Sequence, residues 1–312
     1  MFEIRRYTAA DKSAWDKYVS TARNATFLFR RDYMDYHADR FCDHSLLFYR
    51  NGRLHALLPA HLVGDVLCSH LGLTYGGLVV NFNVTIADVV ELFKQLNPFL
   101  RTCGIKKVVY RPVPWIYHQH PSEEDLYAIF WQCGARLQSR NIGTTIFVQQ
   151  RQPWRKDHRR RLRQALDKGV RVERNGSIEV FWKVLEENLK QRFDAKPVHS
   201  LEEMLLLKSK FPEEIIQYNA YLDEEIIGGI TFYLTPQVLH GQYSSTNALG
   251  KENGAMEAIY QQVMYEDFPH IPYLDFGSST EAGGSIINEG LIAHKEGYGG
   301  RGVCYDTYEW TL

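Results

Sequence analysis

The stretch 214–247, EIIQYNAYLDEEIIGGITFYLTPQVLHGQYSSTN, decides how the second half of this 312-residue chain folds. It consists of runs rich in β-branched and aromatic residues, which are typical of strands. The turn signals Asp223-Glu224-Glu225 and Thr235-Pro236 separate the runs. Strands joined by such short connections pair antiparallel. The stretch therefore predicts an antiparallel meander.

Helices and strands alternate on both sides of this meander. Periodicity and capping residues predict helices at 177–193, 200–211, 254–268 and 288–297, and strands at 272–279 and 303–312. The first half follows the same order, with strands at 2–8, 76–80, 106–113 and 144–150, helices at 9–22, 31–41, 85–100 and 122–134, and a hairpin at 45–68 that turns at Asn51-Gly52. We predict two tandem α+β domains, residues 1–150 and 151–312, each with a mixed, mostly antiparallel sheet flanked by helices.

Composition is that of an ordinary globular protein, with 45% apolar residues, 13% aromatic residues and a net charge of −1. No apolar run is long enough to span a bilayer, and the N-terminus lacks the apolar core of a signal peptide. We therefore expect a cytoplasmic protein without integral membrane contact. The five cysteines are isolated, and His118 and His120 have no evident third ligand, so we expect no metal site. The oligomeric state stays open.

A basic segment joins the two halves. Residues 155–174 hold nine Lys or Arg against three acidic residues, and 155–168 is predicted to be a helix. Arg155, Arg159 and Arg163 lie four residues apart, so they share one stripe of that helix. The stripe is either a solvated helix face or a surface for an anionic ligand, because arginine's planar fork suits phosphate oxygens.

Three segments together resemble the FemABX-like branch of the GNAT acyltransferase superfamily. They are RKDHRRRLRQALDKGVRV at 155–172, PYLDFGSSTEAGG at 272–284 and HKEGYGGRG at 294–302. The resemblance implies two GNAT-like domains in tandem and transfer of an activated acyl group to an amine or hydroxyl. The donor that it implies is either a coenzyme A thioester, as in most of the superfamily, or an aminoacyl-tRNA ester, as in the Fem branch.

The resemblance also places a donor site at KENGAM, residues 251–256, where GNAT proteins bind the coenzyme A pyrophosphate at the start of a helix. The predicted cofactor-binding residues are Lys251, Asn253, Gly254 and Ala255. Met256 stands where a small residue is expected. An equally good interpretation is that Asn253-Gly254 only caps the helix that follows. Acyl-CoA is the expected co-substrate, because most members of the superfamily use it.

Acyl transfer needs a base for the nucleophile and donors for the oxyanion. Asp275, at the end of a predicted strand, and Glu281, in the adjoining loop, are candidate bases, although Asp275 can equally cap a turn or pair with an arginine. The polar strand HGQYSSTN brings Tyr243 as a catalytic candidate and Ser244 as an acceptor contact, unless it is simply a polar edge strand. Lys295 is predicted to bind phosphate or the developing oxyanion.

Phosphate on the substrate is expected to meet basic side chains. The predicted contacts are Arg159 and Arg163 in the basic helix, Arg192 and Lys196 in the loop RFDAKPVHS, and Arg301 near the C-terminus. We expect transfer of an acyl group, most simply acetyl, from acyl-CoA to a sugar nucleotide or another phosphate-bearing cell-envelope precursor. One alternative is a tRNA-dependent peptidoglycan aminoacyl ligase, which the pI of about 6.9 disfavours. A non-enzymatic RNA- or anion-binding module is the other.

Overall fold

The computed structural model describes residues 1–312, apart from the side chains of Arg192 and Phe193. The chain folds into two compact units. Unit 1 comprises Met1–Asn141, Glu281–Ile286 and Cys304–Leu312, and unit 2 comprises Ile142–Thr280 and Ile287–Val303. The predicted boundary at residue 150 lies within unit 2. The last strand, β17 (Arg301–Thr311), pairs over its C-terminal part with β8 (Lys107–Tyr110) of unit 1.

Unit 1 contains two groups of paired strands. The first, antiparallel throughout, has the order β1 (Glu3–Arg6), β3 (Leu46–Arg50), β4 (Arg53–Leu58), β7 (Val79–Val80). The predicted hairpin turn is confirmed between β3 and β4, where Asn51 and Gly52 both have positive φ. In the second group, β17 and β8 are followed by β6 (Val66–Cys68), β5 (His61–Val63) and β2 (Cys42–Asp43). Only β6 and β8 run parallel there.

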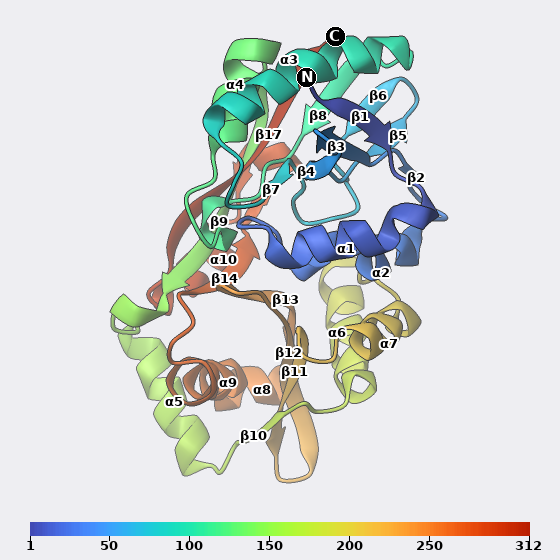
Figure 1. The fold of residues 1–312 in the computed structure, drawn as a ribbon. Helices are drawn as coiled ribbons and strands as arrows, with labels where there is room; N and C mark the ends of the chain where they lie inside the picture. Colours follow the sequence, from blue (N-terminus) through green and yellow to red (C-terminus); the bar gives the residue numbers. More distant parts are fainter. The chain divides into compact units, whose positions relative to one another are not determined.

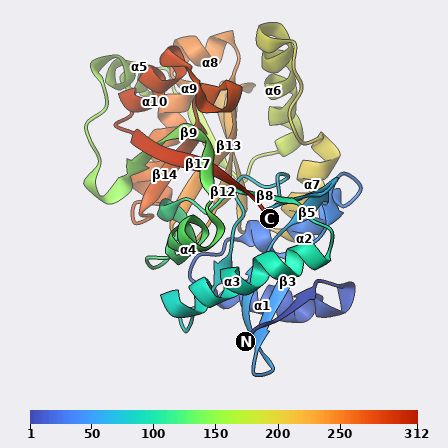
Figure 2. The same cartoon turned by 90° about the horizontal axis from the view of Figure 1, so that it is seen from above.

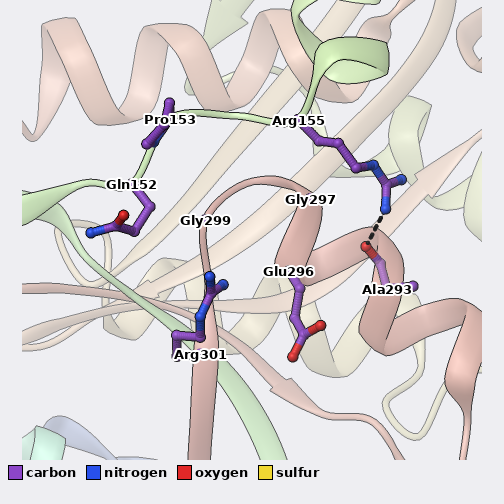
Figure 3. A pocket seen from close by; sticks show the side chains of 8 residues that line it. All are labelled: Gln152, Pro153, Arg155, Ala293, Glu296, Gly297, Gly299 and Arg301. Carbon is purple, nitrogen blue, oxygen red and sulfur yellow. Dashed lines mark hydrogen bonds between the residues drawn. The ribbon is translucent and has the colours of Figure 1, made fainter.

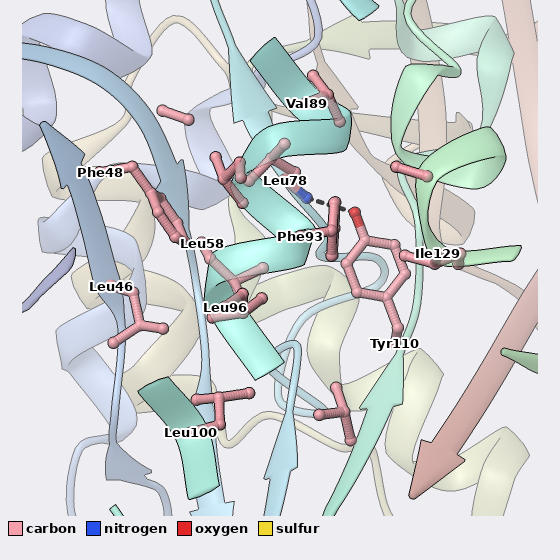
Figure 4. Packing of buried hydrophobic residues seen from close by; sticks show 14 of the residues in the cluster. Leu46, Phe48, Leu58, Leu78, Val89, Phe93, Leu96, Leu100, Tyr110 and Ile129 are labelled. Carbon is pink, nitrogen blue, oxygen red and sulfur yellow. Dashed lines mark hydrogen bonds between the residues drawn. The ribbon is translucent and has the colours of Figure 1, made fainter. Parts of the chain in front are cut away.

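Helices cover both faces of the first of these sheets. They are α1 (Lys12–Thr21), α2 (Arg31–Met34), α3 (Ile86–Thr102) and α4 (Glu124–Cys133). Figure 1 shows α1 and α3 on opposite sides of β3 and β4. Helix α3 begins at a capping box and buries Phe93, Leu96 and Leu100 in the core shown in Figure 4. Beside them, the backbone N–H of Leu78 donates to the hydroxyl of Tyr110 at 2.7 Å.

Unit 2 is built on one sheet, and the predicted meander forms its centre. The strand order is β10 (Arg171–Arg174), β11 (Ile215–Leu222), β12 (Glu225–Leu234), β13 (Val238–Thr246), β14 (Tyr273–Ser278), β9 (Arg136–Phe147). All neighbours are antiparallel except β13 and β14. The short strands β15 (Thr280–Glu281) and β16 (Ile286–Ile287) pair with each other.

The helices of unit 2 pack on the two faces of this sheet. They are α5 (Lys156–Asp167), α6 (Ile178–Phe193), α7 (Leu201–Lys210), α8 (Ala248–Asn253), α9 (Ala255–Gln262) and α10 (Glu289–Gly297). Figures 1 and 2 show α5, α8 and α9 on one side of β11–β13 and α6 and α7 on the other. The predicted helix 254–268 continues past α9 as a π-helical turn, Val263–Asp267. Among the described residues, no helix is both long and apolar enough to cross a membrane.

Candidate active site where two parallel strands separate

The parallel pair in unit 2 ends abruptly. Strands β13 and β14 pair from Val238 opposite Tyr273 to His240 opposite Asp275, and no registered pair follows. Both strands nevertheless continue, β13 to Thr246 and β14 to Ser278. In sheets with parallel strands, ligands bind beyond the carboxyl ends of the strands where neighbours diverge. The side chains at this point are therefore the first candidates for chemistry.

Asp275 is completely buried and holds His240 in place. Its Oδ1 accepts a hydrogen bond from Thr145 Oγ1 at 2.8 Å, and its Oδ2 lies 2.8 Å from Nδ1 of His240. A carboxylate in this position accepts from Nδ1–H, which fixes both the tautomer and the direction of the imidazole. Gly277 has a φ of +70°, and a Cβ added there would come within 3.2 Å of Cε1 of His240. Glycine therefore leaves room for the ring.

Lys295 approaches the same glycine from α10. Its Nζ lies 3.0 Å from the carbonyl oxygens of both Gly277 and Ser278 and 2.7 Å from Oγ of Ser279. The side chain is nearly buried, at 7% exposure. Burial lowers the pKa of Lys295 to about 8, although the charge of Asp275 acts in the opposite direction. An ammonium donates to all three oxygens, whereas the neutral amine can donate to the two carbonyls and accept from the serine hydroxyl.

The structure thus places two predicted catalytic residues, Asp275 and Lys295, near Gly277. It adds the imidazole of His240 as a third group at the same place. From the sequence alone, His240 is only the first residue of the polar strand HGQYSSTN, with no predicted catalytic role. What marks His240 as functional is its pairing with Asp275. That pairing depends on the parallel register of two strands far apart in sequence, so no local pattern indicates it.

The remaining candidate residues lie on β13 and β15. The hydroxyl of Tyr243 lies 2.6 Å from Nδ1 of His199 and accepts from the backbone N–H of the same residue at 3.2 Å, so it anchors the segment between α6 and α7. Burial raises the pKa of Tyr243. Ser244 is exposed on β13. Glu281 belongs to unit 1, in β15.

The predicted cradle for the coenzyme A pyrophosphate is closed by packing, which argues against that prediction. Asn253 and Ala255 are buried, and a Cβ on Gly254 would lie 2.5 Å from the backbone oxygen of Arg161 in α5. The start of α9 therefore faces α5. Gly254 ends α8 in the left-handed conformation, as the alternative capping interpretation expects. Lys251 alone of the four predicted residues is exposed.

Helix α5 is the predicted basic helix, and its two faces differ. On the buried face, Nδ1 of His158 lies 2.8 Å from Oε1 of Glu257, and the hydroxyl of Tyr298 donates to the same oxygen at 3.1 Å. The exposed cationic residues are Lys156, Arg159, Arg160 and Arg163. In the described part of the chain these four side chains form no ion pair, and they recur at the spacing of one helix face. Lys196 is exposed, and the side chain of Arg192 lies outside the described residues.

Arg301 lines a surface hollow of about 590 Å³ in unit 2. The other lining residues are Gln152, Pro153, Arg155, Ala293, Glu296, Gly297 and Gly299 (Figure 3). Arg155 is already engaged, because its guanidinium pairs with Asp157 and donates to the backbone oxygen of Ala293 at 3.2 Å. Of the predicted stripe Arg155, Arg159 and Arg163, Arg155 therefore already uses its guanidinium in contacts within the protein.

Comparison with known proteins identifies the fold. No protein-family model and no curated protein sequence matches the chain. Among solved structures, FemX has a TM-score of 0.69 at 10% identity, covering 99% of this chain and 97% of its own. The C-terminal domain of a putative lysylphosphatidylglycerol synthetase from Agrobacterium fabrum has a TM-score of 0.61 at 10% identity, covering 97% and 92%. A tandem GNAT protein from the clavulanic acid biosynthesis pathway has a TM-score of 0.55 at 11% identity, covering 100% and 98%.

The protein therefore has a FemABX/GNAT-like fold. The predicted fold class, mixed α+β with mostly antiparallel sheets flanked by helices, is confirmed.

Proposed function

We propose that the protein is an acyl-group transferase whose reaction takes place beside Gly277, between His240 and Lys295. The observation that carries this proposal is the convergence of an imidazole oriented by a buried carboxylate and a buried lysine at the end of a parallel strand pair. The imidazole can act as the base for the nucleophile, and the ammonium can donate to the oxyanion.

In the proposed reaction, His240 takes the proton from an attacking amine or hydroxyl through Nε2, because Nδ1 is held by Asp275. Asp275 is then a positioning residue rather than the base, since Thr145 and His240 occupy both of its oxygens. The Lys295 ammonium exchanges its contact with the Ser279 hydroxyl for the substrate carbonyl oxygen, where negative charge develops as the attacking atom bonds to the carbonyl carbon. When the carbonyl re-forms, the bond to the leaving oxygen or sulfur of the donor breaks, and the His240 imidazolium returns its proton to that atom, which departs as a neutral hydroxyl or thiol. A preorganised donor of this kind contributes most in a site that excludes water.

For the donor, we propose an aminoacyl-tRNA ester. Two features support this choice over coenzyme A: the exposed cationic face of α5 suits a polyanion, and the start of α9 is covered by α5. The acceptor is an amine or hydroxyl on a phosphate-bearing small molecule such as a cell-envelope precursor, as the resemblance to the Fem branch implies.

Acyl-CoA is the second candidate donor, because a thioester carbonyl suits the same two groups. It is favoured by the similarity to a tandem GNAT structure that is described as solved without acetyl-CoA. In that case Lys251, which is exposed, remains available for a phosphate.

Both donors can be tested with hydroxylamine, a small amine that replaces an unidentified acceptor. Purified protein is incubated with acetyl-CoA, or with bulk tRNA charged with labelled amino acids, and hydroxamate formation is measured. We expect turnover with charged tRNA, reduced about 10²- to 10³-fold in Lys295→Met and about 10²- to 10⁴-fold in His240→Gln. Lys183→Met, on the exposed face of α6, is the matched control.

The outcomes separate the alternatives. Turnover with acetyl-CoA alone selects the second donor. Full activity of both site variants removes the proposed site, and binding of tRNA without consumption of either donor leaves only an RNA-binding module.

A further inference from the structure

The hollow at the C-terminal end of α10 has two opposite charges that the protein leaves uncompensated. Glu296 is the last residue but one of α10, and Arg301 begins β17. Both side chains are exposed, and they flank the turn that runs through Gly297 and Gly299 (Figure 3). In the described part of the chain, Glu296 has no ion pair within 4.0 Å, and Arg301 has only a hydrogen bond to the neighbouring carbonyl of Gly300.

The two groups therefore form no direct ion pair in the structure, although both line one cavity. At about 590 Å³, the cavity has the size of a small-molecule site. Gln152 adds an amide that donates and accepts, and it lies opposite the turn in the segment before α5. The nearby Arg155 keeps its charge balanced by Asp157.

Glycine allows the turn to pack closely against its neighbours. Gly299 has a φ of +95°, and a Cβ there would come within 2.8 Å of the backbone oxygen of Gln152. A Cβ on Gly297 would lie 2.4 Å from Nε2 of the buried His158. No side chain fits at either position, and these two glycines line the cavity with backbone.

We propose that this hollow binds a small zwitterion, with its carboxylate on Arg301 and its ammonium on Glu296. A phosphate group alone fits less well, because the carboxylate of Glu296 would repel a dianion held by Arg301. A zwitterion instead bridges the two charges and satisfies both. None of the lining residues is Lys295, His240 or Asp275, so this site is separate from the proposed reaction and does not depend on it.

Calorimetric titration of the full chain with glycine, β-alanine and 4-aminobutyrate tests this proposal, because these probes differ only in the separation of their charges. We expect one of them to bind at least tenfold more tightly than butyrate, butylamine or inorganic phosphate. Arg301→Gln and Glu296→Gln should each weaken that binding at least tenfold, whereas Arg159→Gln on the exposed face of α5 should leave it unchanged.

The double variant Arg301→Glu, Glu296→Arg supplies a check on folding. Each single reversal should abolish binding, and the double reversal should restore it, which a merely misfolded protein cannot do. Equal affinity for zwitterions and singly charged analogues, tighter binding of phosphate, or unchanged affinity in both single variants would each overturn the proposal.

Discussion

Because Lys295 is buried, the free energy of unfolding should rise with pH in the alkaline range. The substitution Lys295→Met should remove that rise. Burial lowers its pKa from 10.5 to about 8. Since one pH unit of pKa difference corresponds to about 1.4 kcal/mol, the folded environment disfavours the ammonium by about 3 kcal/mol. Its three hydrogen bonds to neutral oxygens do not offset the loss of water.

The sign follows from proton binding. Between about pH 8 and about pH 10.5, the unfolded chain keeps the Lys295 proton while the folded protein has largely released it, so raising the pH stabilises the fold. The free energy of unfolding should rise by about 2 kcal/mol from this group between pH 8 and pH 10. Lys295→Met lacks that rise, and its unpartnered carbonyls add only an offset that does not change with pH.

Urea unfolding of wild type and Lys295→Met at pH 8, 9 and 10 measures the difference directly. Other groups that titrate in this range, including buried tyrosines, are common to both proteins and cancel. Lys183→Met, an exposed substitution, should run parallel to wild type. If the curves of wild type and Lys295→Met are also parallel, the lysine is not desolvated as its contacts indicate, and the reasoning on its chemistry fails with it.

Acid should destabilise unit 1, because burial lowers the pKa of His61 to about 4 and that of His70 to about 3. Their contribution to stability is complete above about pH 6.5 and is lost toward about pH 4. Between pH 7 and pH 5, the free energy of unfolding should fall by about 2 kcal/mol for each histidine. Urea midpoints that do not move between those pH values would contradict this. Gly254→Ala should cost about 1–3 kcal/mol, because its Cβ would meet the backbone of Arg161 at 2.5 Å and its φ is +72°. A melting temperature equal to wild type would show that α5 and α9 are not packed this closely. Glu257→Gln should cost about 1–3 kcal/mol, because a buried, charge-assisted contact is weakened; circular dichroism melts at neutral pH would detect it, and an unchanged melt would mean that the contact adds no net stability.

Local patterns in the sequence were sufficient for much of the fold. The dipeptide Asn51-Gly52 predicted a hairpin that is present, because only a few residue types tolerate positive φ at both turn positions. The meander at 214–247 and the helix 288–297 were equally readable, since turns, caps and periodicity are short-range properties. The return of the last strand to pair with β8 could not be predicted in this way, because pairing between distant segments is not a local property.

The candidate site shows the same division. Asp275 and Lys295 were chosen from their motifs, and the structure places both beside Gly277. His240 was missed, because its partnership with Asp275 arises from a register between distant strands. The coenzyme A cradle was predicted from local spacing, but whether a helix start faces solvent or another helix is not a local property, and here α5 covers it.

Residue type and spacing alone were therefore enough for the element types, the antiparallel meander, the basic helix and two of the residues at the candidate site. Tertiary packing settled which groups face each other. It made the Lys295 ammonium a buried group with a lowered pKa, turned Asp275 into the support of a histidine, and left Glu296 and Arg301 unpaired in one hollow. These properties depend on distance and desolvation, which arise only when segments far apart in sequence come together.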